Sequence, residues 1–233
     1  MNAKCLNFIG QKSNEAFKWA KEIMPRFFDI SPAVEFPKLI QLLSTSNKLA
    51  PTLKVEKDSA EWQEVDQLLK KSIGNARILA IDMNMNMNQW KLFSVERKRL
   101  ADKAGKAPQE KLLWHGTRNT PSQVIINSDE GLNINYAGDG MWGKGMYFAV
   151  NASYSHKYKS TSADGKNQFF LAHVLLGESV KLESDGSLKE PPMKADGLSR
   201  YDSVQGHTNG SDVFMVYASR KALAKYLVTY ELY

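Results

Sequence analysis

The sequence predicts an α+β domain, in which strands and helices do not alternate regularly along the chain. Helical patterns, with apolar residues three and four apart, gather in the first half of the chain. Short apolar runs typical of buried strands dominate the second half. The chain has no G-x-G-x-x-G fingerprint after a first strand and no regular strand–helix–strand order, which disfavours a doubly wound dinucleotide-binding fold.

Composition limits the classes of protein and of partner. The chain has 233 residues, 42% hydrophobic and 24% charged, which predicts a globular domain with a real core. A net charge of +6 suits an anionic ligand such as a dinucleotide; nucleic acid is weakly supported, because no arginine-rich or aromatic-interleaved stripe is present. The single cysteine, Cys5, excludes an intrachain disulfide and favours an intracellular location, cytoplasmic or nuclear. The four scattered histidines predict no metal site, and no apolar run predicts a membrane span or signal peptide.

Residues 1–50 predict an N-terminal accessory helical segment, separate from a main domain at residues 51–233. Apolar residues at helical spacing indicate helices at 14–28 and 36–43. The polar run 44–51 indicates a linker. The alternative is that this segment ends a larger upstream region of a longer protein.

The main domain begins with a predicted strand at Leu53–Val55, followed by a helix that Asp58 caps and Gly74 ends. Apolar and polar residues alternate over Arg77–Met87, which predicts a half-buried strand. The methionines in that strand are more typical of packing than of a metal site. An amphipathic helix is predicted over Asn88–Lys103.

The second half of the main domain is mainly strands. A helix at Thr120–Ser128, capped by Thr120, and one or two helical turns after Asn151 interrupt them. Glu178–Leu198 is predicted to be a surface loop, and His173 a buried histidine rather than a ligand. Strands are predicted at Leu112–His115, Met146–Val150, Gln168–Leu176, Val213–Ala218 and Tyr226–Leu232.

The stretch Gly143–Tyr158 carries the clearest pattern for a binding site. Two glycines precede a short apolar strand, and Tyr147 projects from that strand. Ser155 and Tyr158 lie three residues apart, which predicts one shared helix face. Two aromatic rings and a hydroxyl would then surround a space that suits a flat ring carrying an amide. Spacing alone leaves ordinary core packing open, because a lone G-x-G is a weak signal.

Three motifs occur in order along the main domain: H-G-T at His115–Thr117, G-K-G-x-Y-F-A at Gly143–Ala149, and S-x-x-Y at Ser155–Tyr158. With the C-terminal strands they closely resemble the catalytic domain of the poly(ADP-ribose) polymerase family, ADP-ribosyltransferases with a diphtheria-toxin-like fold. The resemblance covers roughly residue 51 to the C-terminus. It implies two packed, mostly antiparallel sheets with flanking helices, and NAD as the substrate bound in the cleft between the sheets.

The resemblance also implies roles for individual residues. His115 would bind the ribose hydroxyls of NAD, while the Gly116 backbone and Ser155 would bind the carboxamide. Tyr158 and Tyr147 would cover the two faces of the nicotinamide ring. The implied catalytic residues are His115, Tyr147 and Val213, and the implied NAD-binding residues are His115, Gly116, Thr117, Tyr136, Tyr147, Ala149, Ser155 and Tyr158; the lid role of Tyr136 is the weakest transfer, because its loop is short.

Val213 departs from the polymerising members of that family, which carry a glutamate at this position. A valine can neither bind a hydroxyl nor take a proton, and the neighbouring Asp212 would face the other side of the strand. We therefore expect a mono-ADP-ribosyltransferase, which moves one ADP-ribose unit from NAD to a protein acceptor and releases nicotinamide. The protein itself is a candidate acceptor, and in that class an acidic acceptor can supply the missing carboxylate.

Two alternatives stay open. One is a catalytically inactive module that binds NAD or a partner, and the other is transfer to nucleic-acid ends. Several members of the family carry a long helical bundle before the catalytic domain, and residues 1–50 are too few for it, so we expect it to be absent. The sequence predicts no particular oligomeric state.

Overall fold

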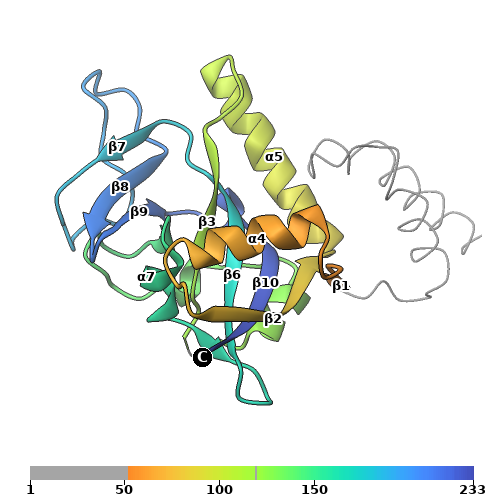
Figure 1. The fold of residues 1–233 in the computed structure, drawn as a ribbon. Helices are drawn as coiled ribbons and strands as arrows, with labels where there is room; N and C mark the ends of the chain where they lie inside the picture. The colour runs from red at the N-terminus through yellow and green to blue at the C-terminus, as the bar shows by residue number, and fades with distance from the viewer. Residues whose placement is uncertain (1–51, 119) are drawn as a thin grey trace, which may run out of the picture. The chain divides into compact units, whose positions relative to one another are not determined.

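The computed structural model describes residues 52–118 and 120–233 (Figure 1). Residues 51–233 form one compact unit. The helices expected at 14–28 and 36–43, and the accessory role of residues 1–50, lie outside the described residues. None of the helices in the described part of the chain combines the length and the apolarity that crossing a bilayer requires.

The described chain is a mixed α/β domain built on one large sheet with few helices. The sheet has ten strands in the order β1-β2-β10-β6-β3-β4-β9-β8-β7, with β5 paired to β6, and every pair is antiparallel except β7 with β8. Its strands are β1 (Thr52–Lys54), β2 (Ala76–Asn84), β3 (Glu110–His115), β4 (Met146–Ala149), β5 (Ser160–Thr161), β6 (Asn167–Leu175), β7 (Ser179–Lys181), β8 (Ser203–Thr208), β9 (Ser211–Val216) and β10 (Ala222–Leu232).

A seam divides this sheet between β3 and β4. Six residue pairs join β3 to β6 and four join β4 to β9, but β3 and β4 share only the pair Trp114–Ala149. By hydrogen bonding the strands therefore form one continuous sheet rather than the two sheets expected, because the pair Trp114–Ala149 links the two halves. The short helix α7 (Ala152–His156) packs against both strands, and so covers the seam.

The remaining helices are α4 (Ala60–Lys70), α5 (Met87–Ala104) and α6 (Ser122–Asn127), with short 3-10 turns at η1 (Ile134–Tyr136) and η2 (Ser219–Lys221). The positions of the three helices were predicted, but the 3-10 turns were not, and two of the predicted caps are wrong. Ser59, not Asp58, accepts the Trp62 N–H that begins α4, and α4 ends before Gly74. Pro121 precedes α6 without a side-chain cap, so Thr120 does not serve as one.

Strand β2 is less regular than its alternating sequence predicts. Ile78 is buried whereas Leu79 is only half-buried, and the four residues from Ile81 to Asn84 are all buried. The cause is a bulge in the pairing with β10, where Thr229 faces Ala80 but Tyr230 faces Ile78, which leaves Leu79 as an extra residue. The segment from Met87 onward belongs to α5 rather than to the strand.

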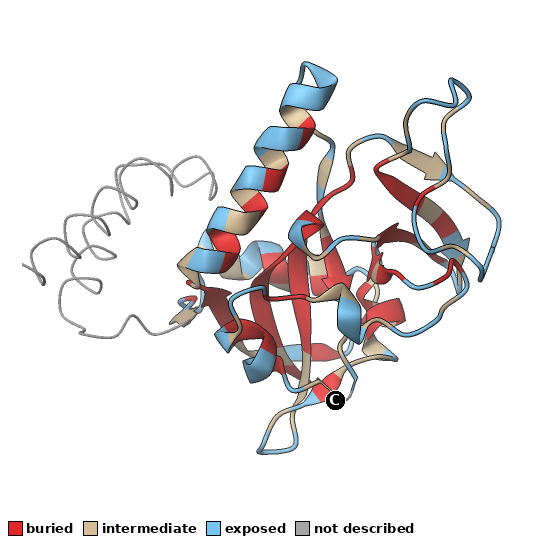
Figure 2. Cartoon of the chain, turned by 180° about the vertical axis from the view of Figure 1, so that it is seen from behind, coloured by how far each residue is buried: buried red, intermediate tan, exposed pale blue. Residues whose placement is uncertain are grey.

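Two strands lie where no strand was expected. β7 falls inside the predicted loop Glu178–Leu198, and β8 precedes β9 in the region between that loop and the C-terminal strands. β10 also starts earlier than expected, at Ala222. Buried residues lie along the central strands and along one stripe of α5, while the outward face of α5 is exposed (Figure 2).

Alternate residues of β4 and β9 enter two different clusters of buried side chains, as the period of a strand requires. The separation matters for the site, because the two tyrosines expected to contact the nicotinamide ring, Tyr147 and Tyr158, pack against only one of the two clusters. Met146, Phe148, Phe214 and Val216 belong to the first cluster, and Ala149, Tyr154, Val213 and Met215 to the second, with Tyr147 and Tyr158 packed against it.

His173 of β6 is largely enclosed, as predicted. Its ring centroid lies 6.5 Å from that of Trp90 and 6.2 Å from that of Phe93, and its Nδ1 lies 2.7 Å from Glu110 Oε1. Burial lowers the pKa of His173, and the nearby charges of Lys225 and Arg97 lower it further, although the contact with Glu110 acts in the opposite direction. The folded protein therefore favours the neutral imidazole.

The lowered pKa of His173 gives a test of this packing. As the pH falls through about 6.5, the unfolded chain takes up the histidine proton before the folded protein does, so the free energy of unfolding decreases. His173→Gln removes that contribution. Between about pH 7.5 and about pH 5.5, we expect the melting temperature of the variant to fall less than that of the wild type. Equal decreases in the two proteins would contradict this account of His173.

Candidate active site

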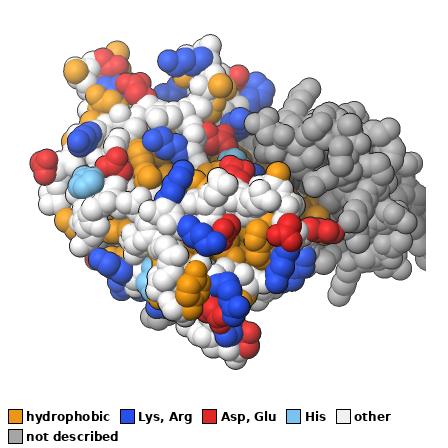
Figure 3. All heavy atoms as spheres, viewed as in Figure 1, with side chains coloured by type: hydrophobic (Ala, Val, Ile, Leu, Met, Phe, Trp, Pro, Cys, Tyr) orange, Lys and Arg blue, Asp and Glu red, His pale blue; other side chains and the backbone are white. Residues whose placement is uncertain are grey.

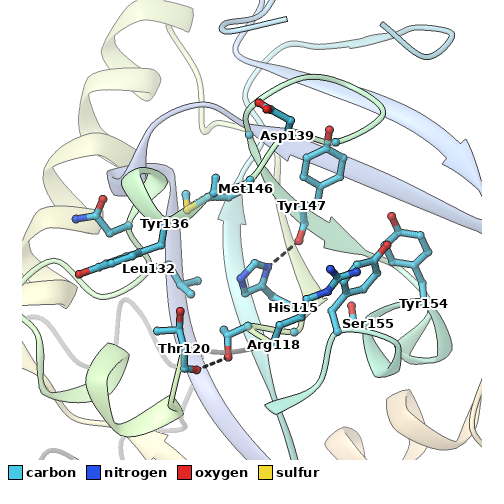
Figure 4. Close-up of a pocket in the computed structure, with 18 of the residues that line it drawn as sticks. His115, Arg118, Thr120, Leu132, Tyr136, Asp139, Met146, Tyr147, Tyr154 and Ser155 are labelled. Carbon is cyan, nitrogen blue, oxygen red and sulfur yellow. Dashed lines mark hydrogen bonds between the residues drawn. The ribbon is translucent and has the colours of Figure 1, made fainter. Parts of the chain in front are cut away.

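A cavity of about 500 Å³ opens beside the seam, at the end of β3. This volume lies in the range that small-molecule ligands occupy. In Figure 4, His115 lies between Tyr136 and Leu132 on one side and Tyr147 and Tyr154 on the other. Three segments far apart in the sequence meet there, namely the end of β3, the loop before β4, and α7 with the turn after it.

His115 crosses the seam with its side chain. Its Nδ1 lies 2.7 Å from the Tyr147 carbonyl, beyond the point where the backbone ladder between β3 and β4 stops. A carbonyl only accepts, so Nδ1 carries the proton and Nε2 carries the lone pair. Burial lowers the pKa of His115, and the hydrogen bond to Tyr147 opposes that shift only in part. His115 is thus a neutral imidazole with Nε2 able to accept a hydrogen bond from a ligand hydroxyl.

Gly116 brings β3 into close contact with the turn after α7. A Cβ at this position would lie 2.3 Å from the Tyr158 carbonyl oxygen and 2.7 Å from that of Ser155, so only glycine fits. Gly116 lines the cavity, and its N–H and carbonyl make no hydrogen bond to another described residue. One donor and one acceptor of the main chain are therefore available to a ligand.

Ser155 and Tyr158 line the same cavity, as predicted, although they do not share one helix. Helix α7 ends at His156, and the Tyr158 N–H then bonds to the Ser155 carbonyl in a turn, which brings the two side chains to the same side. Ser155 is a buried residue that lines the cavity, and its hydroxyl has no hydrogen-bond partner among the described residues. It can therefore pair with a ligand. Asn151 begins α7, but its side-chain amide bonds to Gly210 rather than capping the helix.

Tyr147 holds the glycine turn that precedes β4. Its hydroxyl accepts the Trp142 N–H at 2.7 Å and donates to the Gly143 carbonyl at 2.9 Å, while its ring lines the cavity. Burial raises the pKa of Tyr147 to about 12, so the hydroxyl stays protonated. Tyr147 therefore combines an aromatic wall with an anchor for the turn, a second role that the sequence did not indicate.

The same turn is fixed from outside by the long connection before β8. Gly143 has φ 70°, and a Cβ there would lie 1.7 Å from the Leu188 carbonyl oxygen. That carbonyl accepts the Lys144 N–H at 3.0 Å. The connection predicted as a plain surface loop is thus packed against the back of the site.

Thr117 and Tyr136 also line the cavity, as expected. The Thr117 hydroxyl donates to the Thr120 carbonyl at 2.9 Å and closes the turn after the H-G-T motif. Tyr136 lies in η1 at the rim, with 73% of its surface exposed. A side chain so exposed can cover a ligand but does not shape the cavity by packing.

Ala149 and Val213 do not line the cavity. They face each other across β4 and β9, and both are fully buried in the cluster that contains Tyr154. Asp212 bonds through Oδ1 to His207 at 2.8 Å and does not line the cavity either. The structure thus separates Ala149 and Val213 from the residues that line the cavity. Asp212 does not supply the carboxylate that Val213 lacks.

The lining residues without a predicted role include Arg118, Asp139 and Tyr154. Tyr154 could have been predicted as a site residue, because it lies next to Ser155 in the sequence. Its ring centroid is 5.4 Å from that of Tyr158. Arg118 follows directly after the H-G-T motif. No described group of histidine, cysteine or acidic side chains has the arrangement of a metal site. On the face drawn in Figure 3, basic and acidic side chains are interspersed.

The anchoring role of Tyr147 predicts a local effect of removing its hydroxyl. In Tyr147→Phe the Trp142 N–H loses its acceptor, and amide hydrogen exchange at Trp142 should accelerate by roughly ten- to hundredfold. Tyr136→Phe removes an exposed hydroxyl and serves as the control. Unchanged exchange at Trp142 in Tyr147→Phe would mean that other contacts hold the turn.

The close approach at Gly116 predicts that even a methyl group is not tolerated. Gly116→Ala should lower the free energy of unfolding by about 1–3 kcal/mol, measured by urea unfolding, because two backbone segments must move apart. Gly138→Ala is the matched control, since Gly138 lines the same cavity but a Cβ there meets nothing within 4 Å. Equal effects of the two substitutions would refute the packing argument.

Comparison with known proteins places this geometry in a family. The family described as "Poly(ADP-ribose) polymerase catalytic domain" matches residues 59–209, more than half of the chain but ending before Val213. A probable poly [ADP-ribose] polymerase of Dictyostelium discoideum is 33% identical over 186 residues, which are 76% of this chain and 52% of that protein. Protein mono-ADP-ribosyltransferase PARP14 of Homo sapiens is 30% identical over 176 residues, 73% of this chain and 10% of that protein.

A third relative, protein mono-ADP-ribosyltransferase PARP10 of Mus musculus, is 28% identical over 184 residues, 75% of this chain and 19% of that protein. The chain therefore spans about half, or much less, of the length of these relatives. The matched residues include the end of β3, the glycine turn and α7, which together form the cavity. The chain belongs to the family of the poly(ADP-ribose) polymerase catalytic domain.

Proposed function

We propose that the protein is a mono-ADP-ribosyltransferase that moves one ADP-ribose unit from NAD to a protein acceptor and releases nicotinamide. One observation carries the proposal: the unpaired Gly116 backbone, the Ser155 hydroxyl and the neutral His115 line a single cavity with aromatic walls. A primary carboxamide needs one acceptor and donors in its plane, and a ribose hydroxyl needs an acceptor. Relatives named mono-ADP-ribosyltransferases support the same reaction.

The residues would act mainly by positioning. Gly116 and Ser155 would hold the carboxamide, Tyr158 and Tyr147 would hold the nicotinamide ring, and His115 Nε2 would accept from a ribose hydroxyl. The bond between the ribose carbon and the nicotinamide nitrogen breaks, and the electron pair stays with nicotinamide, which leaves as a neutral molecule. The acceptor oxygen forms the new bond to the same carbon. A fixed imidazole and a fixed ring lower the entropy cost of reaching that arrangement.

Val213 supports transfer of a single unit. Elongation requires a group that activates a ribose hydroxyl, and a valine enclosed by apolar neighbours cannot take its proton. An ionised carboxylate on the acceptor needs no such base, so we propose acidic side chains as acceptors, on other proteins or on the protein itself. Asp139 is the one carboxylate among the described residues that line the cavity.

Two related assignments belong to the same proposal. The two halves of the sheet, joined by a single residue pair, would act as the two packed sheets between which NAD binds. The location would be intracellular, cytoplasmic or nuclear, supported by the single cysteine. A catalytically inactive NAD-binding module remains the second candidate function, favoured by the loss of the carboxylate at Val213.

Labelled NAD tests the proposal directly. The protein is incubated with labelled NAD, alone and with a mixture of candidate proteins, and resolved on a denaturing gel. We expect a sharp labelled band, and a rate roughly ten- to hundredfold lower in His115→Ala, because the ribose hydroxyl loses its acceptor. His207→Ala is the matched control, since His207 is exposed and does not line the cavity.

Each other outcome overturns a specific part. A ladder of labelled products would contradict the role of Val213. Binding of NAD in calorimetry without any label would favour the inactive module. Val213→Glu is a poor comparison for elongation, because an unpaired carboxylate in that apolar cluster would destabilise the fold.

A further inference from the structure

Arg118 covers one face of the Tyr158 ring, the ring on which the proposed function stacks nicotinamide. Its guanidinium carbon lies 4.3 Å from the centroid of that ring. Aromatic rings stack with centroids about 4.5 Å or more apart, so a nicotinamide ring and the guanidinium would compete for the same space. In Figure 4 the Arg118 side chain points toward the part of the cavity that Tyr154 and Ser155 form.

The backbone of Arg118 is fixed while its side chain is exposed. The Arg118 N–H donates to the Tyr158 carbonyl at 2.7 Å, so Tyr158 contacts both the main chain and the side chain of Arg118. Its φ of 47° is in the left-handed region, which is uncommon for a residue other than glycine and is found often at ligand sites. The guanidinium can therefore move without moving the turn.

Charge gives the second, independent observation. Arg118 is the one lysine or arginine among the described residues that line the cavity, and it forms no ion pair with a described carboxylate. NAD carries a diphosphate with two negative charges, and the loop Gly131–Gly140 over the cavity contains no cation. A guanidinium presents paired N–H donors that match a phosphate group.

We infer that Arg118 is a diphosphate-binding residue that covers Tyr158 until NAD enters, and then moves from the ring to the diphosphate. The ring face becomes free for nicotinamide in the same step. This inference rests on the proposed function, because it assumes that NAD is the ligand. It adds a coupling between the two ends of the substrate: the diphosphate end draws away the side chain that blocks the nicotinamide end.

Two fragments of NAD separate these effects in calorimetry. ADP-ribose keeps the diphosphate and lacks the ring, whereas nicotinamide keeps the ring and lacks the diphosphate. In Arg118→Gln we expect ADP-ribose to bind about tenfold or more weakly, because a charge-assisted contact is lost. We expect nicotinamide to bind about two- to fivefold more tightly, because the cation–π contact no longer competes.

Two further variants control the result. Arg118→Lys keeps the charge without the planar fork, and should retain more ADP-ribose affinity than Arg118→Gln. Lys157→Ala removes a positive charge next to Tyr158 from a side chain that does not line the cavity, and should change neither affinity. Melting temperatures confirm that each variant is folded.

The outcomes distinguish the inference from the proposed function. An ADP-ribose affinity in Arg118→Gln within about twofold of the wild type overturns the diphosphate role. A nicotinamide affinity that does not rise overturns the competition for the ring. If the wild-type protein binds NAD but either of these results is found, only this inference is wrong. If the wild-type protein binds neither NAD, ADP-ribose nor nicotinamide, the proposed function is wrong as well.

Discussion

The site depends on the hydrogen bond between His115 Nδ1 and the Tyr147 carbonyl, because it joins the two halves of the sheet beyond the last pair of their ladder. Had the ladder continued, the main-chain groups of Gly116 would have been used by the neighbouring strand. The open seam leaves them available, and the imidazole supplies the cross-link that the missing ladder would have provided. One bond thus stabilises the gap, selects the histidine tautomer and keeps a binding surface of backbone atoms open.

Around that bond, contacts to backbone atoms set the distances. Gly116 leaves no room for a Cβ beside the carbonyls of Ser155 and Tyr158, the Arg118 N–H bonds to the Tyr158 carbonyl, and the Tyr147 hydroxyl bonds to the Gly143 carbonyl. Such contacts vary less than contacts between flexible side chains, so the rings and hydroxyls of the cavity are carried on a rigid frame. This is what a reaction governed by positioning requires.

Much of this arrangement could be predicted from the sequence, because motif order and strand period are local properties. His115, Gly116, Ser155, Tyr158 and Tyr147 line one cavity as expected. Ala149 and Val213 could not be placed, because a motif position does not tell which cluster a strand residue packs into. β7 and β8 are short and partly polar, and are held by pairing, β8 with β9 and β7 with β8. The bulge at Leu79 and the direction of Arg118 depend on pairing and on a positive φ, which no periodicity reveals.

The contact between Leu188 and the Gly143–Lys144 turn extends the site into a part of the chain that carries none of the motifs. An antibody fragment or a small cyclic peptide selected against the connection before β8 would bind behind the turn that the Tyr147 hydroxyl stabilises. Such a reagent could distinguish this protein from relatives that share the motifs but differ in this connection. The surface to target for selectivity is therefore the outer support of the cavity, and not the cavity itself.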